Sequence, residues 1–458
     1  MSAATALHSA LAGRIRGSVV VPGDVGYETD RQVWNARFDR RPTAIVFVAG
    51  PDDVAATLDY AASRSLPITV RAGGHSPAGW SSIDDGIVID LRRLNEILVA
   101  KDGRVTVGGG TIVADLVRRL DNSGLVLPVG TCAGVGIGGL TLSGGLGHLN
   151  GCLGLTCDAL RWAEIVLADG GQRIASVDEE PELFWALRGA GANFGVVTRL
   201  GFQATRLAQG FGGVTAFRGR PVPDVVRTFR DLCLAAGDDL GLELRLLGTG
   251  AGTTAILSAF WAGDPRDGAA ALGPLRRLGD PVAGGFEPVR YAAVATLDDG
   301  AGPRRASYQR SVNLDDLDDG VVRAMADVHD AAEGASFMTL IHRRHGAAAR
   351  APVDASAYPH RKPAFETTFA TSWRAGQDEP GARQRVDAVW AAVRGGELPV
   401  YVGMLDDEPP FRSAAAYGVH HSRLGRVKAL YDPANRFRRN ANIEPCGRSE
   451  TRMRKGLP

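Results

Sequence analysis

Three glycine-rich clusters are the segments of this sequence best suited to binding a phosphate-bearing ligand. They are residues 71–76 (RAGGHS), 136–147 and 189–195. Glycine-rich loops that follow strands expose backbone N–H groups, which bind phosphate oxygens without steric conflict. None of the clusters has the spacing of a Walker loop, and the GVGIGG element at 134–139 lacks the strand-to-helix context of a Rossmann site. We therefore expect three separate loops around one long diphosphate ligand.

Two nucleophiles lie in or beside these clusters. His75 follows two glycines, and an imidazole nitrogen is a good nucleophile near neutral pH. Cys132 precedes the second cluster, and its thiolate would be the reactive form. The residue types alone leave other interpretations open, because a lone histidine is often a polar loop residue and a cysteine among small residues is often a small buried hydrophobe. We interpret Cys152 and Cys157 as packing residues.

The elements that must position the clusters indicate a mixed fold. A short helix is expected over about residues 4–14, followed by strands at 44–49, 68–72 and 86–91 around a helix whose N-cap is Asp52 or Asp53. A second lobe begins near Arg104 and contains a hairpin around Asp169-Gly170-Gly171. From about Leu207, strand-like runs alternate with helical patterns, which predicts an α+β domain with a sheet covered on one face. The run VYVGML at 400–405 is expected to be a strand, and the tail to be helix plus turn.

Composition excludes several classes of function. The 458 residues carry 52 basic and 51 acidic side chains without a charged block, so no nucleic-acid partner is expected. No apolar run approaches the roughly 18 residues of a membrane span, and we expect no membrane contact. Five cysteines do not form a disulfide scaffold, and no metal site is expected. Residues 1–17 lack the pattern of a signal peptide, so we expect a cytoplasmic protein.

Five spaced segments resemble the berberine-bridge-enzyme-like FAD oxidases of the vanillyl-alcohol-oxidase/PCMH flavoprotein superfamily. They are RAGGHSPAGWSS, the run CAGVGIGGLTLSGGLG, LGLTCDAL, PELFWALRGAGANFGVVT and YDPANRFRRNANIEP. The resemblance extends from about Trp34 to Pro445. It implies an α+β fold in which a PCMH-type FAD-binding domain is formed by residues 1–206, as two α/β subdomains of about 1–97 and 98–206, together with 406–458. A substrate domain at 207–405, an antiparallel sheet covered by helices, is inserted between them.

The resemblance also implies that FAD is bound covalently. His75 matches the family's attachment point on the flavin 8α-methyl group, and Cys132 matches the cysteine that binds flavin C6 in bicovalent members. Other cofactor-binding positions follow from the same matched segments. They are Arg71, Gly73, Gly74, Ser76, Gly136, Gly138, Gly139, Thr141, Gly144, Gly145, Asn193, Gly195, Val196, Asn440 and Asn442.

The catalytic base is where this sequence departs from the family. Many relatives carry YGxxYxRL before the YDP segment, and the second tyrosine can act as the base near flavin N5. Here the segment reads YGVHHSRL, and His421 stands in that place. An imidazole accepts a proton at neutral pH more readily than a phenol does. Alternative bases are Tyr417 in the same segment, or substrate-domain residues. The latter are His342, Tyr358 and Tyr401.

The resemblance implies an oxidase that transfers hydride from a substrate C–H bond of an alcohol or amine to flavin N5 and passes the electrons to O2, giving H2O2. The expected partners are a small-molecule substrate and O2, and the protein is expected to be a monomer or a homodimer. We expect a role in secondary-metabolite (antibiotic) tailoring. One alternative is an oligosaccharide oxidase, for which Trp261 or Trp373 would be a stacking aromatic. Another is a flavin-carrying binding or resistance protein without net turnover.

Overall fold

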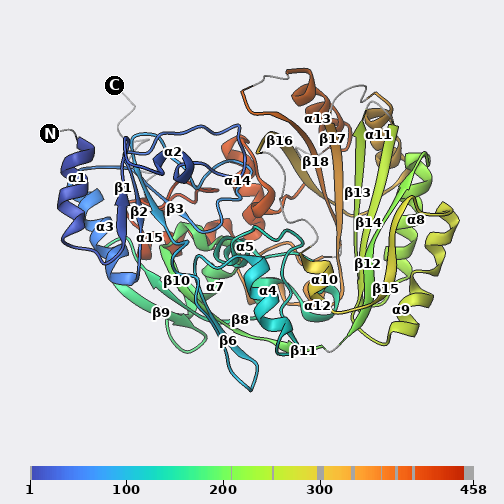
Figure 1. The fold of residues 1–458 in the computed structure, drawn as a ribbon, viewed down its shortest axis with the longest axis horizontal. Helices are drawn as coiled ribbons and strands as arrows, with labels where there is room; N and C mark the ends of the chain where they lie inside the picture. The colour runs from blue at the N-terminus through green and yellow to red at the C-terminus, as the bar shows by residue number, and fades with distance from the viewer. Residues whose placement is uncertain are drawn as a thin grey trace.

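The computed structural model describes residues 3–207, 209–249, 252–296, 304–331, 336–362, 364–376, 380–394 and 398–447. Three sheets of four, five and seven strands dominate the molecule. In Figure 1 the two smaller sheets occupy one half of the molecule, and the seven-stranded sheet with its helices occupies the other. The fold is therefore α+β, as expected. In the part of the chain that the structure describes, no helix is long and apolar enough to cross a membrane.

The first lobe is built on the four-stranded sheet. Its order is β1 (Ser18–Val20), β2 (Ala44–Phe47), β4 (Ile87–Asp90) and β3 (Ile68–Arg71). Strands β2, β4 and β3 are parallel, and β1 joins the edge antiparallel. Helices α1 (Ala3–Ala12) and α3 (Pro51–Ser63) pack on each other, and the short α2 (Tyr27–Asp30) follows β1.

The expected N-cap of α3 is wrong. The helix begins at Pro51, so Gly50 is the N-cap and both aspartates lie in the first turn. Asp53 is buried, and its carboxylate accepts hydrogen bonds from the backbone N–H groups of Arg16, Gly17 and Ala49 at 2.9, 2.9 and 2.8 Å. Asp53 therefore ties the lead-in to β1 to the start of α3.

The second lobe is an antiparallel five-stranded sheet with helices. Its order is β5 (Ile97–Val99), β6 (Arg104–Gly108), β10 (Val196–Gln203), β8 (Leu160–Val166) and β9 (Gln172–Ser176). Strands β8 and β9 form the expected hairpin. The helices and short turns of this lobe are α4 (Val113–Asp121), α5 (Ile137–Ser143), α6 (Asn150–Leu153), η1 (Thr156–Asp158), α7 (Pro181–Ala190) and η2 (Gly191–Asn193). A two-stranded pair, β7 (Leu125–Val126) with β11 (Thr205–Arg206), leads to the next sheet.

The third sheet has seven antiparallel strands. Its order is β15 (Ala283–Val289), β12 (Gly210–Arg218), β14 (Gly252–Trp261), β13 (Leu240–Thr249), β17 (Ser336–Arg344), β18 (Ala364–Arg374) and β16 (Arg305–Leu314). Four helices cover the face that points away from the other half (Figure 1). They are α8 (Val222–Ala235), α9 (Pro265–Ala271), α11 (Asp319–Asp330) and α13 (Pro380–Ala392). The sheet lies within 207–405, whose limits as a domain stay a prediction.

The two faces of this sheet differ in chemistry because side chains alternate along each strand. Leu244, Ile341 and Phe369 belong to a buried apolar cluster that includes Phe229 of α8. Their sequence neighbours point to the other face and are mostly polar.

The alternation overturns the expected aromatic platforms. Trp373 is buried in the apolar cluster and Trp261 packs against it, so neither tryptophan is available as a stacking platform on the polar face. The sequence shows which residues alternate along a strand but not which face of the sheet each set lies on, so the prediction could not place the two tryptophans.

The tail returns to the first half of the molecule. The expected strand at 400–405 is wrong, because the chain turns there into η5 (Val402–Met404) after a single backbone bond from Asn313 N–H to Pro399 O at 2.8 Å. Helix α14 (Pro410–Tyr417), η6 (Gly418–His420) and α15 (His421–Tyr431) follow. Helix α15 packs on α7. The remaining short elements are α10 (Ala292–Ala295), η3 (Gly273–Leu278), α12 (Gly346–Arg350) and η4 (Val353–Ala355).

Candidate active site

The loop that carries His75 lies directly against the second glycine cluster. A Cβ added to Gly73 would lie 2.4 Å from the backbone nitrogen of Gly136, so only glycine allows the two loops to approach so closely. Gly74 adopts a φ of +73°, which favours glycine. A Cβ on Gly134 would lie 2.8 Å from Nε2 of His75. The imidazole therefore faces the loop that holds the second nucleophile.

Cys132 lies in that facing loop, and its side chain is half-buried. Its carbonyl oxygen accepts a hydrogen bond from Val135 N–H at 3.3 Å, which curls the loop toward the start of α5. The structure thus brings the two sequence-predicted nucleophiles onto adjoining loops. Burial raises the pKa of the Cys152 thiol to about 11 and that of Cys157 higher still, which fits their interpretation as packing residues.

The third cluster is joined to the C-terminal tail through Asn193. This fully buried side chain donates from Nδ2 to the hydroxyl of Tyr417 at 3.0 Å, and its Oδ1 accepts from Ile443 N–H at 3.0 Å. The ammonium group of Lys428 also reaches this cluster, donating to Asn193 O at 2.5 Å and pairing with Asp432 at 2.8 Å. The third glycine cluster and the C-terminal tail are therefore held together by one set of hydrogen bonds.

Polar atoms without a partner indicate where a cofactor would fit. Among the described residues, the buried side-chain oxygens of Thr111, Thr141, Asn440 and Asn442 have no hydrogen-bond partner. Buried polar groups are almost always paired, so these atoms fit a bound polar ligand. A Cβ on Gly139 would meet open space. Together with the close-set glycine loops, this donor and acceptor set fits an FAD molecule. Thr111 is an addition to the sequence prediction, and its signal was the GGGT run after β6.

Not every residue predicted to bind the cofactor has a free polar group. The guanidinium of Arg71 is buried and donates to the backbone oxygens of Asp30, Arg31 and Ser81, with Asp90 at 3.6 Å. Burial lowers the pKa of Arg71 to about 10, although Asp90 opposes the shift. Arg71 therefore shapes the loop that carries His75.

The polar face of the seven-stranded sheet contains one row of buried polar side chains. Strand register places Ser258, Glu243, His342, Glu366 and Asn313 opposite one another on β14, β13, β17, β18 and β16. Five neighbouring strands thus contribute one residue each. We call these five residues the polar row. Sequence reasoning found only His342, although single charged residues within apolar strands (LELRLL, FETTF) were a signal for the two glutamates.

Charge pairing sets the protonation of the polar row. His342 Nε2 lies 2.6 Å from Glu243 Oε2, and its Nδ1 lies 3.8 Å from Glu366 Oε2. Burial opposes a charged imidazole, but the two carboxylates outweigh it and raise the pKa of His342 to about 9. Burial likewise opposes a charged Glu243, but His342 and Arg245 hold the pKa of Glu243 well below its usual range. His342 is therefore protonated at neutral pH and is not a proton acceptor there.

A direct contact joins the polar row to the loop of Cys132. The hydroxyl of Thr131, next to Cys132, donates to Glu243 Oε2 at 2.7 Å. At the β14 end, Ser258 bonds His148 at 2.8 Å, and burial lowers the pKa of that histidine to about 4. The row therefore faces the glycine loops.

Two tyrosines predicted for substrate contact lie on the same side as the polar row. The hydroxyl of Tyr401 accepts a hydrogen bond from Gly145 N–H at 3.0 Å, and its ring centroid lies 6.0 Å from that of Tyr358. The Tyr358 hydroxyl accepts from Arg344 at 3.2 Å. Burial raises the pKa of both phenols. These tyrosines therefore bridge the second glycine cluster and the sheet.

The two bases predicted in the tail lie on or beside α15. His421 begins α15, which packs on α7. Its neighbour His420 bonds Val353 O at 2.8 Å, and Arg423 lies over the ring of Trp185. Tyr417 is buried, and its hydroxyl donates to Ala441 O at 2.7 Å and accepts from Asn193 Nδ2 at 3.0 Å. A base role for either residue stays a prediction.

Comparisons with known proteins agree with this architecture. A family model described as "FAD binding domain" matches residues 42–176, and one described as "Berberine and berberine like" matches residues 400–444. The chain is 30% identical to (R)-6-hydroxynicotine oxidase of Paenarthrobacter nicotinovorans, covering 94% of this chain and 98% of that protein. It is 28% identical to an uncharacterized FAD-linked oxidoreductase, YgaK, of Bacillus subtilis (strain 168), covering 95% and 98%.

Solved structures show the same likeness over nearly the whole chain. The structure of 6-hydroxy-D-nicotine oxidase from Arthrobacter nicotinovorans matches with a TM-score of 0.85 and 28% identity, covering 94% of this chain and 98% of the other. A chitooligosaccharide oxidase matches with a TM-score of 0.86 and 25% identity, covering 96% and 99%. The chain therefore belongs to the berberine-bridge-enzyme-like FAD-linked oxidases of the vanillyl-alcohol-oxidase/PCMH flavoprotein superfamily.

Proposed function

We propose that this FAD-dependent oxidase holds its flavin by two covalent bonds, to His75 and Cys132, and oxidises a C–H bond of an alcohol or amine. The observation that carries the proposal is the approach of the His75 imidazole to the loop of Cys132, which is itself bonded to the polar row through Thr131. We also propose that the FAD domain comprises 1–206 and 406–458, and the substrate domain 207–405.

The residues of this chain divide the work around the cofactor. FAD, when bound, accepts hydride and returns the electrons to O2. The residue proposed to accept the substrate's O–H or N–H proton is Glu366. It is buried and, in the described structure, its Oε2 has no hydrogen-bond partner. His342 Nδ1 lies 3.8 Å from this oxygen. Asn313 has both amide atoms unpaired within the described structure and orients a polar group of the substrate.

The proposed substrate is a polar secondary metabolite, such as an antibiotic intermediate. An oligosaccharide is a second candidate, favoured by the hydrogen-bonding groups of the polar row and by the likeness to a chitooligosaccharide oxidase. H2O2 release from a panel of sugars and polycyclic natural products separates the two. Tight binding without H2O2 release would instead indicate a binding or resistance protein.

The cofactor bonds can be tested by acid precipitation of the purified protein. We expect all flavin to remain with the wild-type polypeptide. His75→Ala and Cys132→Ala should each retain flavin through the remaining bond, and the double variant should release it all. Cys152→Ala is the matched control, because this thiol is kept protonated and should not affect retention. FAD free in the acid supernatant of wild-type protein would overturn the covalent proposal, and retention by the double variant would reassign the bonds.

A further inference from the structure

The segment from Val33 to Arg37, between α2 and β2, contacts both the loop of His75 and the outermost strand of the seven-stranded sheet. Arg304 on the approach to β16 donates to Val33 O at 2.7 and 2.9 Å, and Ala36 N–H donates to Arg305 O at 3.0 Å. One short segment therefore touches two parts of the molecule that are more than 200 residues apart in the sequence. We call Val33–Arg37 the clasp.

Trp34 connects the clasp to His75. Its ring lies parallel to the imidazole, with centroids 5.4 Å apart and an interplanar angle of 22°. Its backbone N–H donates to Gly74 O at 3.1 Å, which fixes the ring beside the loop. The indole is still 41% exposed, so its contact with His75 rather than core packing accounts for its placement.

Asn35 connects the loop to the sheet through four hydrogen bonds. Its Nδ2 donates to Pro77 O at 2.7 Å and to Ser307 O at 3.0 Å. Its Oδ1 accepts from Ser307 N–H at 2.9 Å and from Arg37 N–H at 3.1 Å. The side chain is buried, so these bonds to the loop, the sheet and the clasp satisfy both of its amide atoms.

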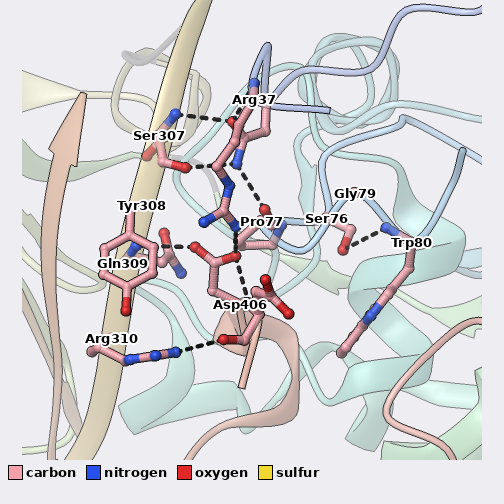
Figure 2. A network of polar contacts seen from close by, with 12 residues as sticks. Arg37, Ser76, Pro77, Gly79, Trp80, Ser307, Tyr308, Gln309, Arg310 and Asp406 are labelled. Atoms are coloured by element: carbon pink, nitrogen blue, oxygen red, sulfur yellow. Dashed lines mark hydrogen bonds and ion pairs between the residues drawn. The ribbon is translucent and has the colours of Figure 1, made fainter. Parts of the chain in front are cut away.

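The C-terminal end of the clasp is held by an ion pair. Figure 2 shows Arg37 reaching the carboxylate of Asp406, which also accepts from Gln309 N–H at 3.0 Å. Arg310 donates to Asp407 O at 2.9 Å. The clasp thus joins the His75 loop, strand β16 and the start of the tail in one connected network.

We propose that Trp34 and Asn35 are positioning residues for flavin attachment at His75. The inference rests on the proposed covalent bond to that histidine. Attachment replaces an imidazole N–H bond and a flavin methyl C–H bond by one N–C bond, and the two protons and two electrons released reduce O2 to H2O2. Trp34 sets the plane of the imidazole, and Asn35 sets the depth of its loop relative to the sheet.

The test measures the fraction of purified protein whose His75 peptide carries flavin, by peptide mass, together with total bound flavin. Because a misplacement of about 1 Å can slow a reaction about 100-fold, Trp34→Ala should lower the fraction of His75 peptide that carries flavin about 10-fold or more. Trp34→Phe keeps a flat ring and should retain most of the flavin attachment at His75. The flavin bond to Cys132 should persist in both variants.

Asn35→Asp tests the second half of the proposal. A carboxylate oxygen would replace Nδ2 and face two carbonyl oxygens, so attachment at His75 should fall as in Trp34→Ala. Asn122→Asp, an exposed substitution with the same charge change, is the control. Full attachment in Trp34→Ala would overturn the inference while leaving the covalent bond in place. A wild-type His75 peptide without flavin would instead overturn the proposed function.

Discussion

At the scale of single residues, the structure offers a second candidate for the proton acceptor. An oxygen of a buried carboxylate without a hydrogen-bond partner is costly unless something binds it. Glu366 Oε2 is such an atom in the described structure, and a protonated histidine stands beside it. His421, the base expected from sequence, begins a helix that packs on α7. Both side chains can accept a proton, and the unpaired oxygen is the reason that we propose Glu366.

We therefore predict that Glu366→Gln, which keeps the shape but not the basicity, slows flavin reduction by about 10² to 10⁴. His421→Ala is the comparison variant and should reduce flavin at close to the wild-type rate. The measurement is anaerobic stopped-flow at neutral pH with a substrate found in the H2O2 panel. Reoxidation by O2 should change little in either variant. If His421→Ala is the slow variant, the base lies in the YGVHHSRL segment and the polar row only binds substrate.

At the scale of elements, the glycine loops were predictable and the polar row was not. Close loop contacts such as Gly73 to Gly136 leave a local signal, because only glycine fits them. The polar row depends on which strands are neighbours. Glu243, His342 and Glu366 are separated by more than 20 residues from one another, and only the order β13-β17-β18 places them side by side. The turn at Val402 also could not be predicted locally, because an apolar run has the pattern of a strand whether or not the chain continues in the sheet.

The polar row predicts how stability depends on pH. The pKa of His342 is about 9 in the folded protein, above the usual value near 6.5. A raised folded pKa means that the imidazolium stabilises the fold fully below about pH 6.5, and that this stabilisation is lost as the pH rises through 9. The melting temperature of wild-type protein should therefore fall between these values more steeply than that of His342→Gln. Equal slopes in the two proteins would show that His342 is not charged in the fold.

At the scale of the whole molecule, the C-terminal tail packs against the first half of the chain. Phe437, Ala441 and Ile443 are buried, and Arg436 donates to Leu58 O and Ala168 O at 2.7 Å each. Lys428 is fully buried, and it loses Phe437 O as a hydrogen-bond acceptor if the tail is removed. A hydrogen bond to a charged group typically contributes about 1.5–3 kcal/mol to stability. Residues 436–443 therefore pack against the first half of the chain.

We predict that a chain ending at Asp432 is unstable and free of flavin. Because this truncation can fail to fold at all, a milder variant tests the contact with the cofactor. Asn440→Ala with Asn442→Ala removes two oxygens that have no partner in the described structure and leaves the buried apolar side chains in place. It also removes the bonds from Asn440 Nδ2 to Ala192 O and Phe437 O, so folding is measured alongside. In a His75→Ala, Cys132→Ala background, where binding would be reversible, this pair should weaken FAD binding by about 10-fold or more, since each lost hydrogen bond costs about 0.5–1.5 kcal/mol. The measurement is FAD titration by flavin fluorescence, with the melting temperature as the check on folding. Unchanged FAD affinity in a folded variant would mean that the tail supports the fold without touching the cofactor.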